Sequence, residues 1–141
     1  MDVLKNQKTD FKEIIYEKSN WVARITINRP QVYNSYSTNA LEELATAFRQ
    51  AAFDDEVAVI VYTGMGDKAF CTGGDVKEYQ ERYTRSPHDY WKYMRLFGAY
   101  IESIVNTGKP VVARINGMAV GGGNESNLAC DLAVIAEHAW V

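Results

Sequence analysis

The sequence has few residues of the types that build metal sites, disulfide frameworks or membrane spans. Of its 141 residues, two are cysteine and two are histidine. Cys71 and Cys130 form neither a CxxC pair nor a Cys/His ligand spacing, which predicts no metal site and two reduced thiols. No stretch approaches the roughly 20 apolar residues that a transmembrane helix needs, so we expect no membrane partner.

An excess of basic residues is also missing. Fifteen Lys and Arg stand against 18 Asp and Glu, and the formal net charge is −3. Contacts to phosphate backbones need a basic face, so this balance argues against a nucleic-acid partner. It leaves room for a small anionic ligand held by a few cations. The polar N-terminus lacks the apolar stretch of a signal peptide, so we expect a cytoplasmic protein, with residues 1–10 disordered.

The sequence does contain alternating strand and helix patterns. The runs 14–17 and 21–27 predict a hairpin with its turn at 18–20. After residue 37, continuous apolar runs typical of buried strands alternate with helical patterns; these runs are 57–62, 111–115 and 131–136. This order predicts one domain of the α/β class with parallel crossovers.

Two helices have clear starts. Ser37 or Thr38 is expected to cap the first, whose apolar face is Leu41, Leu44, Ala45 and Phe48. Ser86 followed by Pro87 is expected to start the second, whose apolar face we assign to Tyr90, Met94, Phe97, Ile101 and Ile104. Within that helix, Tyr90, Trp91 and Tyr93 are more typical of core and surface aromatics than of a stacking platform.

Two glycine-rich loops, residues 64–75 and 116–125, each follow a predicted strand and open a helix. In open α/β sheets this is where ligands bind. Glycines let the backbone approach a ligand, and a helix N-terminus offers unpaired N–H donors. Two such ends converging on one carbonyl oxygen would form an oxyanion hole. Neither loop matches GxxxxGK[ST] or GxGxxG, and either alone could be a tight turn.

Glu125 is the best acid/base candidate, since it lies three residues past Gly122 on the first helical turn. We expect partial burial to raise its pKa toward a useful value. The alternative is an ordinary acid that interacts with the helix dipole. Asp75 is more typical of a helix N-cap. Arg29, Lys68 and Lys77 could each contact a phosphate, or be solvated surface charges.

Four motifs, in order and spacing, resemble the crotonase (enoyl-CoA hydratase/isomerase) superfamily. They are Ile27–Pro30 with Asn34-Ser35, Lys68–Glu78, Lys109–Ala113, and Asn116–Glu125 followed by Cys130-Asp131-Leu132. The resemblance runs from about residue 12 to the end of the sequence. It implies a crotonase-like ββα spiral core, an acyl-CoA substrate, no cofactor beyond its CoA moiety, and a homo-trimer or hexamer.

The family's second catalytic acid and its C-terminal helical region would lie beyond Val141. The resemblance therefore implies that residues 1–141 are the N-terminal part of a crotonase-fold domain, truncated before that helical region.

The resemblance also assigns roles to single residues. Gly74 and Gly122 would donate the oxyanion N–H groups, and Glu125 stands where the hydratases have their first catalytic glutamate. The CoA channel would be lined by Arg29, Ala69, Thr72, Gly73, Asp75, Val76 and Lys77.

Runs such as 63–74 and Tyr93–Phe97 are similar to a narrower group within the family. Its members hydrate and then hydrolytically open a cyclic acyl-CoA in anaerobic benzoyl-CoA degradation. Enoyl- or dienoyl-CoA hydratases and isomerases, dihydroxynaphthoyl-CoA synthases, and a non-catalytic acyl-CoA-binding fragment remain alternatives.

Overall fold

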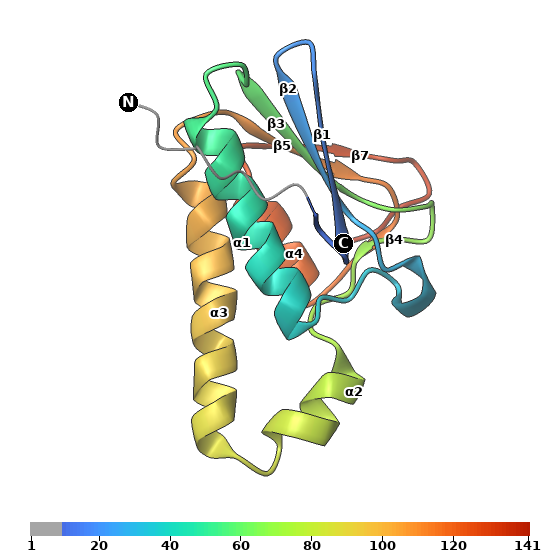
Figure 1. Ribbon diagram of the computed structural model, residues 1–141. Helices are drawn as coiled ribbons and strands as arrows, with labels where there is room; N and C mark the ends of the chain where they lie inside the picture. The colour runs from blue at the N-terminus through green and yellow to red at the C-terminus, as the bar shows by residue number, and fades with distance from the viewer. Residues whose placement is uncertain (1–9) are drawn as a thin grey trace.

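The computed structural model describes residues 10–141 and shows a twisted sheet with helices packed on it (Figure 1). The main sheet has five strands in the order β1-β2-β3-β5-β7. Only β1 and β2 pair antiparallel, and every later neighbour is parallel, which confirms the predicted crossovers. Helices α1 and α3 lie side by side against the sheet. In the described part, no helix combines the length and apolar character of a membrane span.

The hairpin consists of β1, Ile14–Ser19, and β2, Val22–Ile27. Its turn is Asn20-Trp21, because Ser19 pairs with Val22, so the predicted turn at 18–20 is misplaced. Both turn residues have positive φ, 50° and 66°, as the I′ turns that suit twisted hairpins require. Asn tolerates this conformation well, whereas the bulky Trp21 is an uncommon choice that only the paired strands on either side impose.

Helix α1, Thr38–Phe53, follows the predicted pattern. The Ser37 side chain accepts a hydrogen bond from the Ala40 N–H, which confirms the cap. Leu41, Leu44 and Phe48 are buried against the sheet.

Helix α3, Pro87–Val105, starts as expected, with the Ser86 side chain accepting from the Asp89 N–H. Its predicted apolar face is partly wrong. Tyr90 and Met94 are exposed, whereas the buried residues are Tyr93, Tyr100 and Ile104. The face is rotated because the first half of α3 packs against the segment 76–83 rather than against the sheet.

The parallel strands are β3, Val59–Gly64, β5, Val111–Ile115, and β7, Leu132–Ile135. β3 begins two residues later than predicted, and β5 has the predicted bounds. β7 is the edge strand next to β5, and its apolar side chains are exposed.

Two short strands within the glycine-rich loops were not predicted. β4, Ala69–Cys71, and β6, Met118–Ala119, pair parallel and form a second, two-stranded sheet. The remaining elements are short: the 3-10 turn η1, Pro30–Val32; helix α2, Val76–Glu78; the π-helical turn η2, Tyr79–Tyr83; and helix α4, Gly122–Leu128. Helix α4 begins at Gly122, within the second glycine-rich loop.

The core lies between the sheet and helices α1 and α3. Tyr62 and Tyr100 share a hydrogen bond of 2.5 Å between their buried hydroxyls, and both rings pack against Phe48. Two buried amides brace the start of β4: Asn34 and Asn116 both donate to the Ala69 carbonyl, at 2.7 and 3.1 Å. These bonds fix β4 to the rest of the fold.

Arg29 connects three separate segments. Its guanidinium forms an ion pair with Glu13 and another with Asp75, both at 2.9 Å, and donates to the Ser35 carbonyl at 2.5 Å. The Arg29 side chain is only 12% exposed, and its guanidinium is bonded to these three partners. Asp75 directly follows Gly74, so the ion pair between Arg29 and Asp75 connects the first glycine loop to the end of the hairpin.

We expect Asp75→Asn to lower the melting temperature at neutral pH and much less in acid. Partial burial raises the pKa of Asp75, but hydrogen bonds from Arg29 and from the Glu78 and Lys77 amides outweigh it, and the pKa is lowered. A carboxyl with a lowered folded-state pKa stabilises the protein above its unfolded pKa, and this contribution is lost as the pH falls through the folded value. Asn keeps the helix cap.

Thermal unfolding of both proteins across the acid range measures the effect, which we expect to reach about 1 kcal/mol at neutral pH. A difference that persists unchanged at the acid end would contradict a role for the Asp75 charge.

Candidate active site at the two glycine loops

The two predicted glycine loops lie next to each other because the short strands within them, β4 and β6, are paired. Cys71 of β4 pairs with Ala119 of β6, and the Val120 N–H donates to the Cys71 carbonyl at 3.1 Å. Parallel strands end on the same side, so both loops leave this small sheet together. The two loops therefore lie side by side, as a shared site would require, and that they form one site remains a prediction.

Gly73 of the first loop lies close to the backbone of the second loop. A Cβ built on it would lie 3.2 Å from the Gly122 amide nitrogen and 3.5 Å from the Val120 carbonyl. Its φ is +90°, a conformation that side chains other than glycine rarely adopt. Its carbonyl accepts from the Tyr36 N–H at 2.9 Å. Glycine at 73 is thus required by both conformation and space.

The two amides predicted as oxyanion donors are unused. Among residues 10–141, the N–H groups of Gly74 and Gly122 donate to no protein acceptor, while their neighbours do. The Asp75 N–H donates to Tyr36 at 3.0 Å, and the Gly123 N–H donates to Val120 at 3.0 Å. An unpaired N–H needs water or a ligand, and so both groups are free to donate a hydrogen bond to a ligand oxygen.

Aromatic side chains pack closely on both glycines. A Cβ on Gly122 would overlap the Tyr36 hydroxyl and lie 3.2 Å from Phe97. A Cβ on Gly74 would overlap the Tyr79 ring and lie 2.8 Å from the Tyr93 hydroxyl. Tyr36 cannot easily move away, since it is 3% exposed and stacked on Phe97 at 5.7 Å. The space beside the amides is therefore shaped by aromatic rings.

The tyrosines of this cluster remain protonated near neutral pH. Burial is the largest cause that raises the pKa of Tyr36, Tyr79 and Tyr93. The Glu125 carboxylate adds to the raised pKa of Tyr36 and of Tyr79, which places its charge close to both hydroxyls. The hydroxyls can therefore donate hydrogen bonds beside a carboxylate.

Glu125 lies on the first turn of α4, as predicted, but the expected partial burial is wrong. The residue is exposed, because α4 is short and its outer side faces solvent; Leu128 on the same helix is 75% exposed. Its role as an acid or base remains a prediction.

The residues predicted to line a CoA channel have different surroundings. Val76 and Lys77 are exposed and the Thr72 hydroxyl donates to the Tyr33 carbonyl at 3.2 Å. Ala69 is buried with its carbonyl occupied by the two amides described above. Asp75 caps α2, accepting from the Lys77 and Glu78 amides.

Arg29, also assigned to the CoA channel, is held in the ion pairs described above. Arg29 and Asp75 thus both stabilise the fold, through their ion pair and through the cap on α2. Contact of this set with CoA remains a prediction.

The cysteines do not provide a nucleophile. Burial raises the pKa of Cys71 to about 12, and that of Cys130 to about 12 as well. A thiol of this kind is neutral at physiological pH and unreactive. Within residues 10–141 no three His, Cys, Asp or Glu side chains gather in a way that could hold a metal ion.

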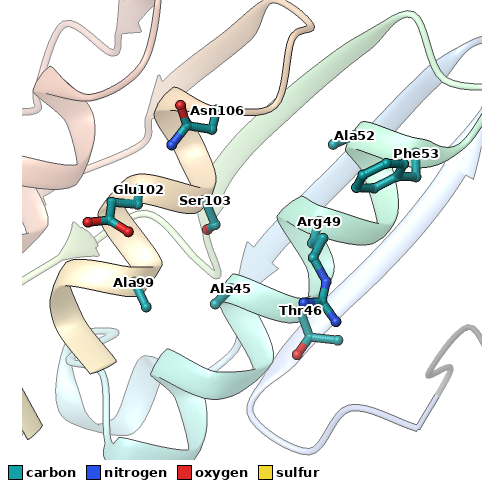
Figure 2. Close-up of a pocket in the computed structure, with 9 residues that line it drawn as sticks. All are labelled: Ala45, Thr46, Arg49, Ala52, Phe53, Ala99, Glu102, Ser103 and Asn106. Carbon is teal, nitrogen blue, oxygen red and sulfur yellow. The ribbon is translucent and has the colours of Figure 1, made fainter. Parts of the chain in front are cut away.

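A groove of about 430 Å³ lies away from the glycine loops, between the C-terminal halves of α1 and α3 (Figure 2). Figure 2 shows Arg49 and Phe53 on α1, with Glu102 on α3 and Asn106 directly after its end. The sequence analysis assigned no role to these residues, and the groove contains none of the predicted site residues.

Comparison with known proteins agrees with the geometry. Residues 17–141 match the family described as Enoyl-CoA hydratase/isomerase. The chain is 45% identical over 117 residues to a protein of Geobacter metallireducens named 6-oxocyclohex-1-ene-1-carbonyl-CoA hydrolase, covering 83% of this chain and 31% of that protein. It is 46% identical over 115 residues to a protein of the same name from Thauera aromatica, covering 82% and 30%.

Solved structures show the same fold. An enoyl-CoA hydratase from Bacillus anthracis superposes with a TM-score of 0.84 at 34% identity, over 91% of this chain and 49% of that one. An enoyl-CoA hydratase/carnithine racemase from Magnetospirillum magneticum gives 0.87 at 27% identity, over 92% and 48%. The chain spans less than a third of the two named hydrolases and about half of these structures.

The match over nearly all of the chain, the shared parallel sheet and the paired glycine loops lead to one conclusion: this chain belongs to the crotonase (enoyl-CoA hydratase/isomerase) family.

Proposed function

We propose that the protein is an enzyme that binds an acyl-CoA and stabilises the enolate of its thioester. The observation that carries this proposal is the pair of unused amides, Gly74 and Gly122, on adjacent loops at the ends of β4 and β6. Two fixed N–H donors suit an oxygen on which negative charge develops, and such donors typically lower a barrier by about 2.7–4 kcal/mol each. A thioester carbonyl that becomes an enolate places its charge on that oxygen.

The substrate that we favour is 6-oxocyclohex-1-ene-1-carbonyl-CoA, in anaerobic benzoyl-CoA degradation. Two relatives at 45% and 46% identity carry that name. First, the oxygen of water adds to the ring carbon β to the thioester, and a proton goes to the α-carbon. Next, a second water attacks the ring ketone, and the bond between the ketone carbon and the α-carbon breaks.

The electron pair of the broken bond passes to the α-carbon and the thioester oxygen, and the α-carbon then takes a proton. The former ketone carbon leaves as a carboxylic acid. The product is a hydroxylated dicarboxylic mono-thioester. Both steps pass through a thioester enolate, so one pair of amides serves both.

Glu125 is the residue that we propose to position or activate water, together with an acid that the family places beyond Val141. Its charge lies beside the hydroxyls of Tyr36 and Tyr79, next to the two glycines. That location supports the proposal, while its exposure in residues 10–141 calls for a direct test.

The rest of the proposal follows family membership. We propose that Arg29, Ala69 and the segment 72–77 contact the CoA moiety, and that no other cofactor takes part. We also propose a homo-trimer or hexamer located in the cytoplasm.

A second candidate is simple enoyl-CoA hydration. It is favoured by the Bacillus anthracis enoyl-CoA hydratase, which shares the fold with a TM-score of 0.84 at 34% identity. Dihydroxynaphthoyl-CoA synthesis and a non-catalytic acyl-CoA-binding role are the remaining alternatives.

Mass spectrometry of the products distinguishes these functions. We expect the full-length protein, given 6-oxocyclohex-1-ene-1-carbonyl-CoA, to form a ring-opened thioester that is heavier than the substrate by two waters. A product heavier by one water with its ring intact would support hydration alone. No consumption of any enoyl-CoA in a substrate panel would support the non-catalytic role.

We expect Gly122→Ala to lower turnover by about 100-fold, because its methyl overlaps the Tyr36 hydroxyl and must displace the loop that carries the amide. Steady-state kinetics measure this. Gly98→Ala is a matched control, since a Cβ at Gly98 in α3 meets no atom within 4 Å. We expect the control to keep full turnover and to be slightly more stable, as Ala favours helix over Gly. Equal turnover in both variants would contradict the role of the Gly122 amide.

We expect Glu125→Gln to lose most turnover, by about 100-fold or more, while its affinity for acyl-CoA stays within about twofold of the parent. Gln keeps the size of the side chain and removes its charge and basicity. Turnover and calorimetric binding of a saturated acyl-CoA are measured side by side, with the exposed Glu102→Gln as control. Unchanged turnover in Glu125→Gln would reject the acid/base role.

A further inference from the structure

Tyr93 carries a buried hydroxyl whose polar neighbour, the Tyr79 hydroxyl, does not meet it with hydrogen-bond geometry. The side chain is 2% exposed, and among the described residues no group meets its hydroxyl with hydrogen-bond geometry. A buried polar group without a partner typically costs about 1–3 kcal/mol of stability. Most such groups in native proteins are paired, so this one requires an explanation.

The position of this hydroxyl points to the reacting centre. It lies 2.8 Å from the point that a Cβ on Gly74 would occupy, and the Tyr79 hydroxyl lies 3.0 Å from the same point. The Gly74 N–H is one of the two amides open to a ligand oxygen. A third donor thus stands beside an unused backbone donor.

The surrounding rings hold Tyr93 in place. Its ring centroid lies 4.8 Å from that of Tyr79, in an edge-on contact, and 5.0 Å from that of Tyr83, in a tilted one. Tyr83 is itself fixed by a 2.5 Å hydrogen bond between its hydroxyl and that of Thr38 in α1. Because the ring is fixed, the Tyr93 hydroxyl is positioned before any ligand arrives, which is the condition for effective electrostatic stabilisation.

The Tyr93 hydroxyl also stays protonated. Burial raises its pKa, and the neighbouring hydroxyls of Tyr79 and Tyr36 and the Glu78 carboxylate add to that shift. Tyr93 therefore donates a hydrogen bond and does not transfer its proton.

We propose that Tyr93 donates a hydrogen bond to a second oxygen of the acyl group, the ring carbonyl oxygen that lies β to the thioester. This inference rests on the proposed function and names the feature of the substrate that the site selects. In a β-dicarbonyl the two oxygens lie side by side, as Gly74 and Tyr93 do. A simple enoyl thioester has no oxygen at that place and would leave the hydroxyl unpaired.

The proposal gives Tyr93 a role in ring opening. As the oxygen of water adds to the ring carbonyl carbon, the carbonyl oxygen becomes negative and the hydrogen bond from Tyr93 strengthens. When the bond to the α-carbon breaks, that oxygen becomes part of the new carboxyl group. The released electron pair moves to the thioester oxygen, which the glycine amides hold. Tyr93 thus serves the ketone, and the amides serve the thioester.

The test is Tyr93→Phe in the full-length protein, which removes the hydroxyl and keeps the ring. We expect the rate of ring opening to fall by about 10- to 100-fold, as measured by mass spectrometry of the ring-opened thioester. We expect the Kd for cyclohexane-1-carbonyl-CoA, which has no ring oxygen, to be unchanged. Tyr90→Phe, with its exposed ring one turn earlier on α3, is the control and should match the parent in both assays.

The melting temperature separates this role from a structural one. Because the hydroxyl has no partner, we expect Tyr93→Phe to be as stable as the parent or more stable. A less stable variant with equal losses for both thioesters would show that the hydroxyl supports the fold, and would overturn the proposal.

If the parent and Tyr93→Phe open the ring at the same rate, the role of Tyr93 is overturned, while the proposed function stands. A parent that opens no β-oxo ring thioester would overturn the proposed function and this inference with it.

Discussion

The site depends on one short parallel pairing, that of β4 with β6. Five residues form these strands, yet the pairing of Cys71 with Ala119 brings two loops together that are almost 50 residues apart in sequence. Asn34 and Asn116 fix β4 through the Ala69 carbonyl, and Arg29 holds the residue after Gly74. Without this pairing, Gly74 and Gly122 would have no reason to be near each other.

Glycine is required at this site for space more than for freedom of the backbone. In the consecutive glycines 73–74 and 121–123, only Gly73 and Gly121 have positive φ. Gly74 and Gly122 instead lie against aromatic atoms that a methyl group would overlap. The same rings that would collide with a side chain also line the space beside the two amides. Gly74 and Gly122 therefore leave the space that the neighbouring aromatic rings occupy, so glycines and rings at this site depend on each other.

Local signals in the sequence were enough for much of the fold. Ser37 and Ser86 cap their helices as predicted, because a cap is a bond between neighbours in sequence. β4 and β6 were missed because strands of three and two residues show no periodicity. On α3, Phe97 and Ile104 were assigned to the packed face correctly, whereas Met94 and Ile101 were chosen in place of their neighbours Tyr93 and Tyr100.

A second stripe on α3 has helical spacing too, made of Tyr93, Phe97, Tyr100 and Ile104. Only the position of η2, which packs on Tyr93, decides between this stripe and the one that we assigned. Glu125 and the two glycine loops were chosen from their place between strand and helix, and motif resemblance then assigned the roles of Gly74, Gly122 and Glu125. Tyr36 and Tyr79 were not foreseen, since their closeness to the glycines is a property of the folded chain.

Tyr36 gives the site a mechanical link to the largest helical layer. Its N–H and carbonyl bond to Gly73 and Asp75, its ring rests on Phe97 of α3, and the next residue, Ser37, is the cap of α1. A displacement of the glycine loop therefore moves Tyr36 directly, and through it both helices. The position of the two amides is therefore fixed through α1 and α3, and a force on the glycine loop would be transmitted to these two long helices.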